Sequence, residues 1–264
     1  MDPLLSFFSP LGAFDPSAVL GAAAIVMIGS FVKGAIGFAL PTIAFALITM
    51  FLTPQETIGL MILPLLLSNW WQMIRQGWAA AWETFRAFWR LNLVLFGLIG
   101  FVAQAVPHIP PERLVTVLGL VVTLAAGLQL AGWRPRIEKT GALRPRLETA
   151  TGGLAGVIGG LTGVWGPPVM FFLIALGIPK TEQIRAQGVC FFLGSVVLVA
   201  AHATSGVINA STLPFSVAMV PAMILGMALG LKAQDRLNQE LFRRATLVVL
   251  CLAGLNLLRQ GLSG

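Results

Sequence analysis

The chain consists almost entirely of apolar runs of helix length, separated by short polar connectors. A membrane-spanning helix needs about 20 apolar residues to cross a hydrocarbon core of about 30 Å. The runs are continuous rather than alternating, which favours helices over the strands of a membrane barrel. The sequence therefore predicts an all-α, multi-pass protein of the cell (inner, cytoplasmic) membrane. The apolar runs cover residues 17–32, 38–52, 57–74, 87–106, 114–131, 150–164, 168–178, 186–203, 213–231 and 245–258.

The composition leaves no room for a separate soluble domain. Hydrophobic residues make up 57% of the 264 positions, charged residues make up 10%, and the mean hydropathy is +0.88. The two cysteines lie inside apolar runs, and neither they nor the two histidines have the spacing of metal ligands. We therefore expect no metal, no cofactor and no enzymatic activity.

The basic residues mark one side of the membrane rather than a nucleic-acid surface. Lysine and arginine concentrate in three connectors, at residues 75–90, 134–146 and 232–244, and are absent from residues 203–213. The positive-inside rule then places the three basic connectors in the cytoplasm and both termini outside. Five tryptophans around the first basic connector are expected to form an aromatic belt at the lipid headgroups: Trp70, Trp71, Trp78, Trp82 and Trp89.

An internal repeat divides the chain into two similar halves. The sequence GAIG, which starts at Gly34, returns as GLTG at Gly160, 126 residues later. The sequence AGLQL, which starts at Ala126, returns near the end as AGLNL at Ala253. Self-similarity over most of each half indicates two copies of one structural unit.

The repeat predicts the domain organisation and the fold class. Residues 1–131 form the first membrane repeat, residues 132–148 form a basic cytoplasmic linker, and residues 149–264 form the second repeat. Each unit has an odd number of crossings, so the second copy enters the membrane inverted. We expect about eight to ten transmembrane or re-entrant helices. In secondary transporters, such inverted repeats place the substrate site near the midplane, between broken helices.

Clusters of glycine and proline interrupt each half at corresponding points, residues 33–41 and 160–168. Both residue types break helices, and a helix that restarts with proline presents the positive end of its dipole to an anion. The alternative is that the glycines only let helices pack closely. Trp165 is expected to line or cap a shared cavity. The candidate substrate-binding residues are Lys33, Gly34, Gly37, Phe38, Pro41, Gly160, Gly163, Trp165, Gly166, Pro167 and Pro168.

A few polar residues within the apolar runs are further candidates. Lys33 is a charge at membrane depth, which marks a functional position, although its long side chain could instead reach the interface. Its repeat counterpart is Gly159, so any role in binding is asymmetric. Asn69 and Gln72 could line a polar path. His202 could carry a coupling proton or could be a histidine satisfied by hydrogen bonds.

With these motifs, the sequence resembles the TauE/SafE family of sulfite and organosulfonate exporters, also called toluene-sulfonate uptake permeases. The resemblance rests on GAIGFALP, GLTGVWGPP, the connector GIPKTEQIRA from Gly177, and the AGL(Q/N)L ending of each half. It implies transport of a small anion such as sulfite, an organosulfonate, or a related sulfur-containing or carboxylate anion. A proton or sodium ion could be coupled to transport, and the chain could form a homodimer. Its other partner is the lipid bilayer, and no nucleic acid is expected.

The main alternative is a membrane-embedded accessory or assembly protein without a transported substrate. Such a protein needs no polar cavity, so apolar side chains would pack its broken helices tightly. A membrane enzyme would need converging nucleophilic, acid–base or metal-binding groups, and the chain has almost none.

Overall fold

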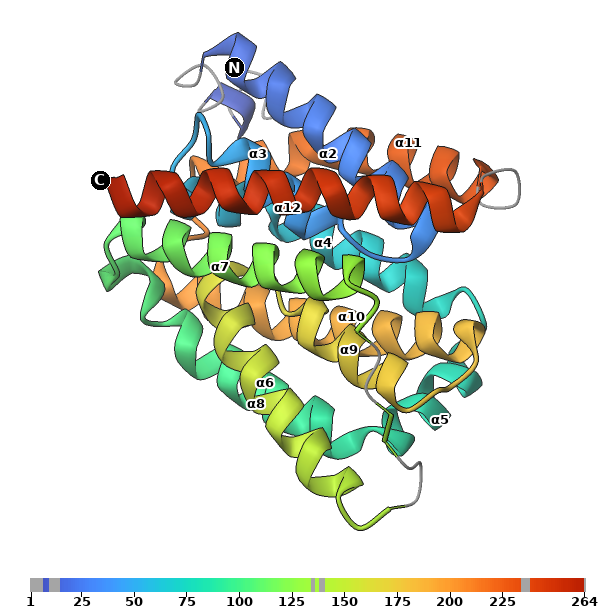
Figure 1. Ribbon diagram of the computed structural model, residues 1–264. Coiled ribbons are helices and arrows are strands. Elements are labelled where there is room, and N and C mark those ends of the chain that lie inside the picture. Colours follow the sequence, from blue (N-terminus) through green and yellow to red (C-terminus); the bar gives the residue numbers. More distant parts are fainter. Residues whose placement is uncertain (1–6, 10–14, 134–135, 138–140, 234–237, 264) are drawn as a thin grey trace.

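The structure is a computed structural model, and its described part consists of helices joined by turns and loops, without strands (Figure 1). The described residues are 7–9, 15–133, 136–137, 141–233 and 238–263. Seven helices in this part are long and apolar enough to cross a membrane, which confirms the prediction of an all-α, multi-pass membrane protein. The α-helices are α2 (Pro16–Ile36), α3 (Leu40–Ile48), α4 (Pro54–Ile74), α5 (Trp78–Ala87), α6 (Trp89–Ala103), α7 (Pro111–Leu130), α8 (Arg144–Thr162), α9 (Gly166–Ala175), α10 (Lys180–Ser205), α11 (Thr212–Ala233) and α12 (Gln239–Ser263).

The structure differs from the sequence prediction in two connectors. The connector around Gly77 contains a short additional helix, α5, whose buried residues are Ala81 and Thr84. Its polar residues hide it from a search for apolar runs, and its exposed Trp78 and Trp82 fit the expected belt. Helix α8 begins at Arg144, inside the range expected to be linker.

The helix pairings repeat when the two halves are exchanged. Helices α2, α3, α4 and α7 occupy the repeat positions of α8, α9, α10 and α12, and α6 corresponds to α11. Helix α2 packs on α11, and its counterpart α8 packs on α6. Two equivalent pairs pack on each other, α4 with α10 and α7 with α12. Such reciprocal pairings are those of two copies related by a two-fold axis.

Helices α7 and α12 run antiparallel and approach closely through small residues. A Cβ atom at Gly261 would lie 2.7 Å from the Thr116 nitrogen, whereas one at Gly254 would lie 2.8 Å from the Thr123 nitrogen. Residue numbers therefore fall along α12 as the numbers of their contact partners rise along α7, so the two helices run in opposite directions. Two equivalent helices that run antiparallel are related by a two-fold axis perpendicular to the helices, because an axis parallel to them would leave both pointing the same way.

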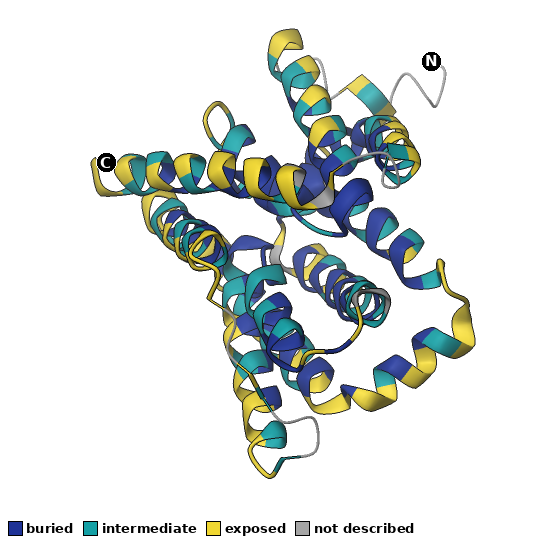
Figure 2. Cartoon of the chain, turned by 45° about the vertical axis from the view of Figure 1, so that its right-hand side comes forward, coloured by how far each residue is buried: buried dark blue, intermediate teal, exposed yellow. Residues whose placement is uncertain are grey.

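The helix ends that flank two of the basic connectors lie at one end of the helix bundle. In Figure 1, α4 and α11 end at the right, where α10 and α12 begin, opposite the C-terminus, whereas α8 begins at the bottom of the view. Figure 2 shows exposed residues along the outer side of α12. The exposed residues of this helix include the apolar Leu252 and Leu255. An apolar outer surface is what lipid contact requires, and one basic end agrees with the predicted topology.

The contact between α2 and α11 depends on glycine. A Cβ atom at Gly226 would overlap the carbonyl oxygen of Met27, and one at Gly230 would overlap that of Phe31. Gly127, in α7, has open space where its Cβ atom would lie.

We predict that Gly226→Ala forces α2 and α11 apart and lowers the unfolding free energy by about 1–3 kcal/mol. The matched control, Gly127→Ala, adds the same methyl group without a clash and should be neutral or stabilise by up to about 1 kcal/mol. Thermal unfolding of both variants in detergent compares them. Equal melting temperatures for the two variants would contradict the close helix contact.

Candidate functional site

The first glycine/proline cluster breaks the helix at the predicted place. Helix α2 ends at Ile36, Gly37 has a φ of 91°, and α3 begins at Leu40. Between them, Ala39 also has a positive φ, 87°, which costs a residue with a Cβ atom about 1 kcal/mol or more. The chain therefore unwinds over three residues before α3 starts, with Pro41 in its first turn.

The second cluster forms the equivalent break. Helix α8 ends at Thr162, Gly163 has a φ of 71°, and α9 begins at Gly166 with two prolines following. Trp165 is the residue immediately before α9 and is 3% exposed. Both halves thus contain a broken helix, and the short α3 and α9 each start inside the bundle.

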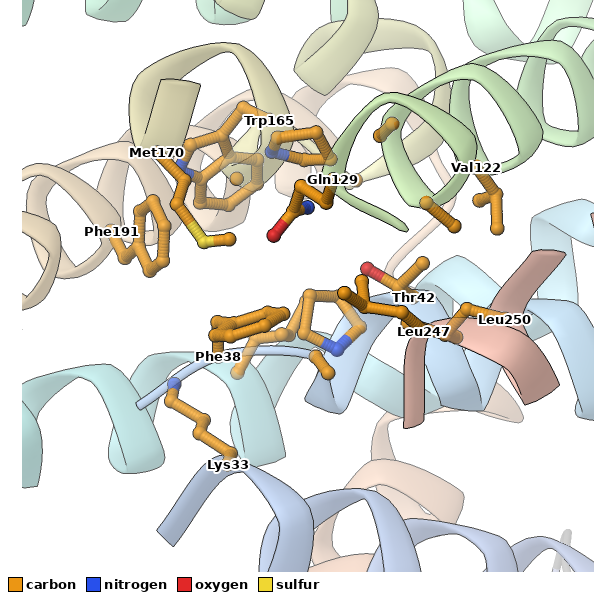
Figure 3. A pocket seen from close by; sticks show the side chains of 18 of the residues that line it. Lys33, Phe38, Thr42, Val122, Gln129, Trp165, Met170, Phe191, Leu247 and Leu250 are labelled. Atoms are coloured by element: carbon orange, nitrogen blue, oxygen red, sulfur yellow. The ribbon is translucent and has the colours of Figure 1, made fainter. Parts of the chain in front are cut away.

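A cavity lies between the starting points of α3 and α9 (Figure 3). Its volume is ≈ 40 Å³, enough for a few water molecules or a small ion. Figure 3 shows Trp165, Met170 and Gln129 facing Phe38 and Thr42 across this space. Helices α7 and α12 close one side of the cavity.

Lys33 is the charged residue of the cavity wall, and it is 1% exposed. Its ammonium donates hydrogen bonds to Ser68 Oγ, at 3.0 Å, and to Asn69 Oδ1. Both acceptors are neutral, and no ion pair to Lys33 is found among the described residues. A buried cation without a carboxylate is strongly destabilised, so this site favours the approach of an anion.

Asn69 connects the Lys33 site to the other half of the chain. Its amide Nδ2 donates to the Phe191 carbonyl, at 3.1 Å, and to Ser195 Oγ, at 3.4 Å. Asn69 and Ser195 are 126 residues apart, so they are equivalent positions of the repeat. Equivalent positions that touch lie beside the axis relating the halves, and α4 and α10 therefore cross there.

An open vestibule adjoins the cavity on the side of the basic connectors. Its volume is ≈ 380 Å³, and it shares Phe38, Gln129 and Met170 with the cavity wall. Glu240, at its rim, is exposed and is hydrogen-bonded by Arg243 and Arg244, which lower the pKa of its carboxyl group. The rim of the vestibule thus carries a negative charge on Glu240 and positive charges on Arg243 and Arg244.

A much smaller space occupies the equivalent position at the opposite end. Ile36 and Ile184 line the vestibule, and their repeat counterparts Thr162 and Ile58 line a cavity of ≈ 10 Å³. Apolar side chains fill this region, including Leu118. The two spaces are therefore unequal in volume.

Most of the predicted site residues surround the central cavity. Those that line it are Lys33, Phe38, Pro41, Asn69, Gly163, Trp165, Gly166 and Pro167. Gly34 instead packs against α11, and Gly160 against Val102 of α6. These two glycines therefore allow close helix packing, which is the alternative role considered for them. Pro168 is not part of the cavity wall.

The remaining polar candidates lie outside the cavity. Gln72 donates to the Gly37 and Ile184 carbonyls, at 3.1 Å each, and thereby ties α4 to the first break and to α10. Gln72 and Gly37 line a separate space of ≈ 10 Å³ behind Lys33. His202 is fully buried on α10 and does not line any of these cavities.

The sequence did not single out several residues of the wall. Gln129 lines both the cavity and the vestibule, and Ser68, next to the wall, accepts a hydrogen bond from Lys33. Both are polar residues inside apolar runs, and that signal could have found them. Apolar wall residues carry no such signal: Met170, Phe191, Leu247 and Leu250. No cluster of three or more metal-ligating side chains occurs in the described ranges.

A multi-pass helical protein whose two broken helices start at one buried cavity is built as a membrane transporter. The sequence comparison agrees: the model of the sulfite exporter TauE/SafE family matches residues 21–257, and the chain belongs to this family. The predicted resemblance is thereby confirmed. No curated protein and no solved structure gave a match.

We predict unequal roles for the two residues at the repeat axis. Asn69→Ala removes an acceptor from a buried ammonium and should lower the unfolding free energy by about 1.5–3 kcal/mol. Ser195→Ala removes a long, neutral hydrogen bond and should cost less than about 1 kcal/mol. Thermal or denaturant unfolding measures both.

A double-mutant cycle tests the cause of the Asn69 effect. In a Lys33→Met background, which keeps the aliphatic stem without the charge, Asn69→Ala should lose most of its cost. An equal cost in both backgrounds would show that Asn69 does not stabilise the ammonium.

Proposed function

We propose that the protein is a secondary transporter that moves a small anion across the cytoplasmic membrane through the central cavity. The observation that carries the proposal is the buried Lys33 ammonium, whose partners among the described residues, Ser68 and Asn69, are neutral. A substrate anion would supply the missing countercharge. The positive dipole ends of α3 and α9 at the same cavity favour the same charge.

The size of the cavity favours a small substrate. A volume of ≈ 40 Å³ holds a few non-hydrogen atoms, as in sulfite, a short organosulfonate or a small carboxylate. The name of the family, sulfite exporter, fits this size and charge. The accessory-protein alternative expects apolar packing at the broken ends, and the charged cavity disfavours it.

The unequal volumes of the vestibule and its counterpart support transport by exchange of conformations between the two inverted halves. Each space would be the access route of one conformation. The open vestibule lies at the end of the basic connectors, which the positive-inside rule places in the cytoplasm. Transport would close this route and open its counterpart around Ile58 and Leu118. A proton or sodium ion would drive the exchange, and His202 does not line the cavity, the vestibule or the space behind Lys33.

Removal of the Lys33 charge should abolish anion binding and transport. Wild-type protein should be stabilised by sulfite, by about 2.7 kcal/mol at a hundredfold excess over Kd, and should move it across proteoliposome membranes. Lys33→Met should lose both effects, while Lys232→Met, which removes an exposed lysine of α11, should keep both. Sulfite transport by Lys33→Met at the wild-type rate would contradict the proposal.

Matched cysteines should report the unequal routes. In a background with Cys190→Ala and Cys251→Ala, Ile184→Cys in the vestibule should react with a water-soluble maleimide at least about tenfold faster than its counterpart Ile58→Cys. Denatured samples should react equally, because only folding distinguishes the two thiols. Equal rates in the folded protein would contradict the closed state of the second route.

A further inference from the structure

The rim of the vestibule carries charge, whereas the rest of its described wall is neutral. Glu240 and Arg243, near the start of α12, are the charged residues that line it in the described ranges. The side chain of Arg243 is 24% exposed, whereas that of the neighbouring Arg244 is 69% exposed and does not line the vestibule. One of two adjacent arginines therefore belongs to the route that leads to the cavity.

The Glu240 carboxylate occupies the guanidinium group of Arg243. Arg243 donates hydrogen bonds from Nε, at 3.3 Å, and from Nη2, at 3.2 Å, and both carboxylate oxygens accept. Arg244 donates from its Nε to Oε1 of the same carboxylate, at 2.9 Å. Two guanidinium groups thus share one carboxylate, and the three side chains together carry one positive charge. Oxyanions bind arginine through the same N–H groups, so Glu240 holds the place that a free anion would take.

The geometry of the three side chains allows this carboxylate to be exchanged. An exposed ion pair contributes little to stability, because water screens it, and the Glu240 side chain is 52% exposed. If a free anion displaced the carboxylate from Arg243, Glu240 would keep its hydrogen bond to Arg244. A singly charged anion would then leave each of the two arginines with one negative partner.

The equivalent position in the first half lacks such a group. The motifs at Ala126 and Ala253 lie 127 residues apart, and the same spacing along the continuous helices pairs Arg243 with Thr116 of α7. Thr116 donates to the Glu112 carbonyl of its own helix, at 2.7 Å. The described residues that line the counterpart cavity carry no charge. Arg243 is therefore a feature of one route and not of the repeated fold.

Membrane topology alone does not distinguish the two arginines. The positive-inside rule accounts for basic residues at this end of the bundle by the side of the membrane on which they lie. It treats Arg243 and Arg244 alike, because they are neighbours at the start of one helix. Only their placement relative to the vestibule separates them.

We propose that Arg243 forms a second anion-binding site, which captures the substrate anion before it reaches Lys33, and that Glu240 competes with the anion for this site. The vestibule leads from the rim to the cavity, because Phe38 and Gln129 line both spaces. A positive charge at the mouth of such a route raises the local concentration of anions. This inference rests on the proposed anion transport and adds to it a capture residue and an internal competitor.

Uptake of sulfite by inside-out membrane vesicles, which expose the cytoplasmic side, tests the inference. At low ionic strength, Arg243→Gln should lower kcat/KM at least about fivefold and leave kcat unchanged, because capture limits the rate only at low sulfite concentration. Glu240→Gln should raise kcat/KM at least about twofold, because the guanidinium group loses its competitor. At about 1 M salt, where the screening length is about 3 Å, the variants should approach the wild type.

Arg244→Gln is the matched control. It makes the same change of charge as Arg243→Gln and also removes a hydrogen bond to Glu240, but it does not alter the vestibule wall. Its kcat/KM should stay within about twofold of the wild-type value. Equal losses in Arg243→Gln and Arg244→Gln, or no loss in either, would overturn the capture site.

The sign of the Glu240 effect separates capture from a purely structural ion pair. If the pair only stabilised α12, Glu240→Gln and Arg243→Gln would break the same contact and shift kcat/KM in the same direction. An unchanged or lowered kcat/KM in Glu240→Gln would therefore overturn the inference, even if Arg243→Gln did not fold. The melting temperature of each variant in detergent shows whether it is folded.

Failure of this inference is distinguishable from failure of the proposed function. If the wild type takes up sulfite, Lys33→Met does not, and Arg243→Gln equals the wild type, only the capture site is overturned. If wild-type vesicles take up no more sulfite than vesicles without the protein, both are overturned.

Discussion

The hydrogen bonds from the Lys33 ammonium to Ser68 and Asn69 place one positive charge inside a bundle whose buried residues are mainly apolar. The surrounding structure depends on satisfying that charge with neutral groups. Asn69 can hold the ammonium because its own amide is anchored to the Phe191 carbonyl of the other half. Gly34 lets α2, which carries the lysine, pack directly on α11. The same contacts that hold the cation therefore also join the halves.

The parts of the site that the sequence predicted are those with local causes. Glycine and proline change the backbone wherever they occur, so the breaks at Gly37 and Gly163 were visible in the sequence. A lysine within an apolar run is equally conspicuous. The repeat then showed that the two breaks occupy equivalent positions and allowed the helix order to be predicted.

The parts that the sequence could not predict depend on tertiary packing. Gly34 and Gly163 belong to similar motifs, yet one packs against a helix and the other lines the cavity. Only the neighbouring helix distinguishes them. Leu247 and Leu250 of α12 enter the wall because α12 crosses α7, and no local pattern encodes that crossing. The unequal volumes of the vestibule and its counterpart likewise arise from arrangement, because the equivalent pairs Ile36/Thr162 and Ile184/Ile58 line both.

The contact between Asn69 and Ser195 has a consequence for how such a site can be encoded. Two identical chains arranged around this axis would each bring a lysine to the centre, and the two ammonium groups would repel each other. Each residue beside the axis would also face its own copy from the other chain. A single chain with diverged halves can hold an odd number of charges, with asparagine facing serine and a lysine on one side only. Divergence of the halves, which fusion into one chain permits, thus lets a two-fold arrangement hold a single lysine near its centre.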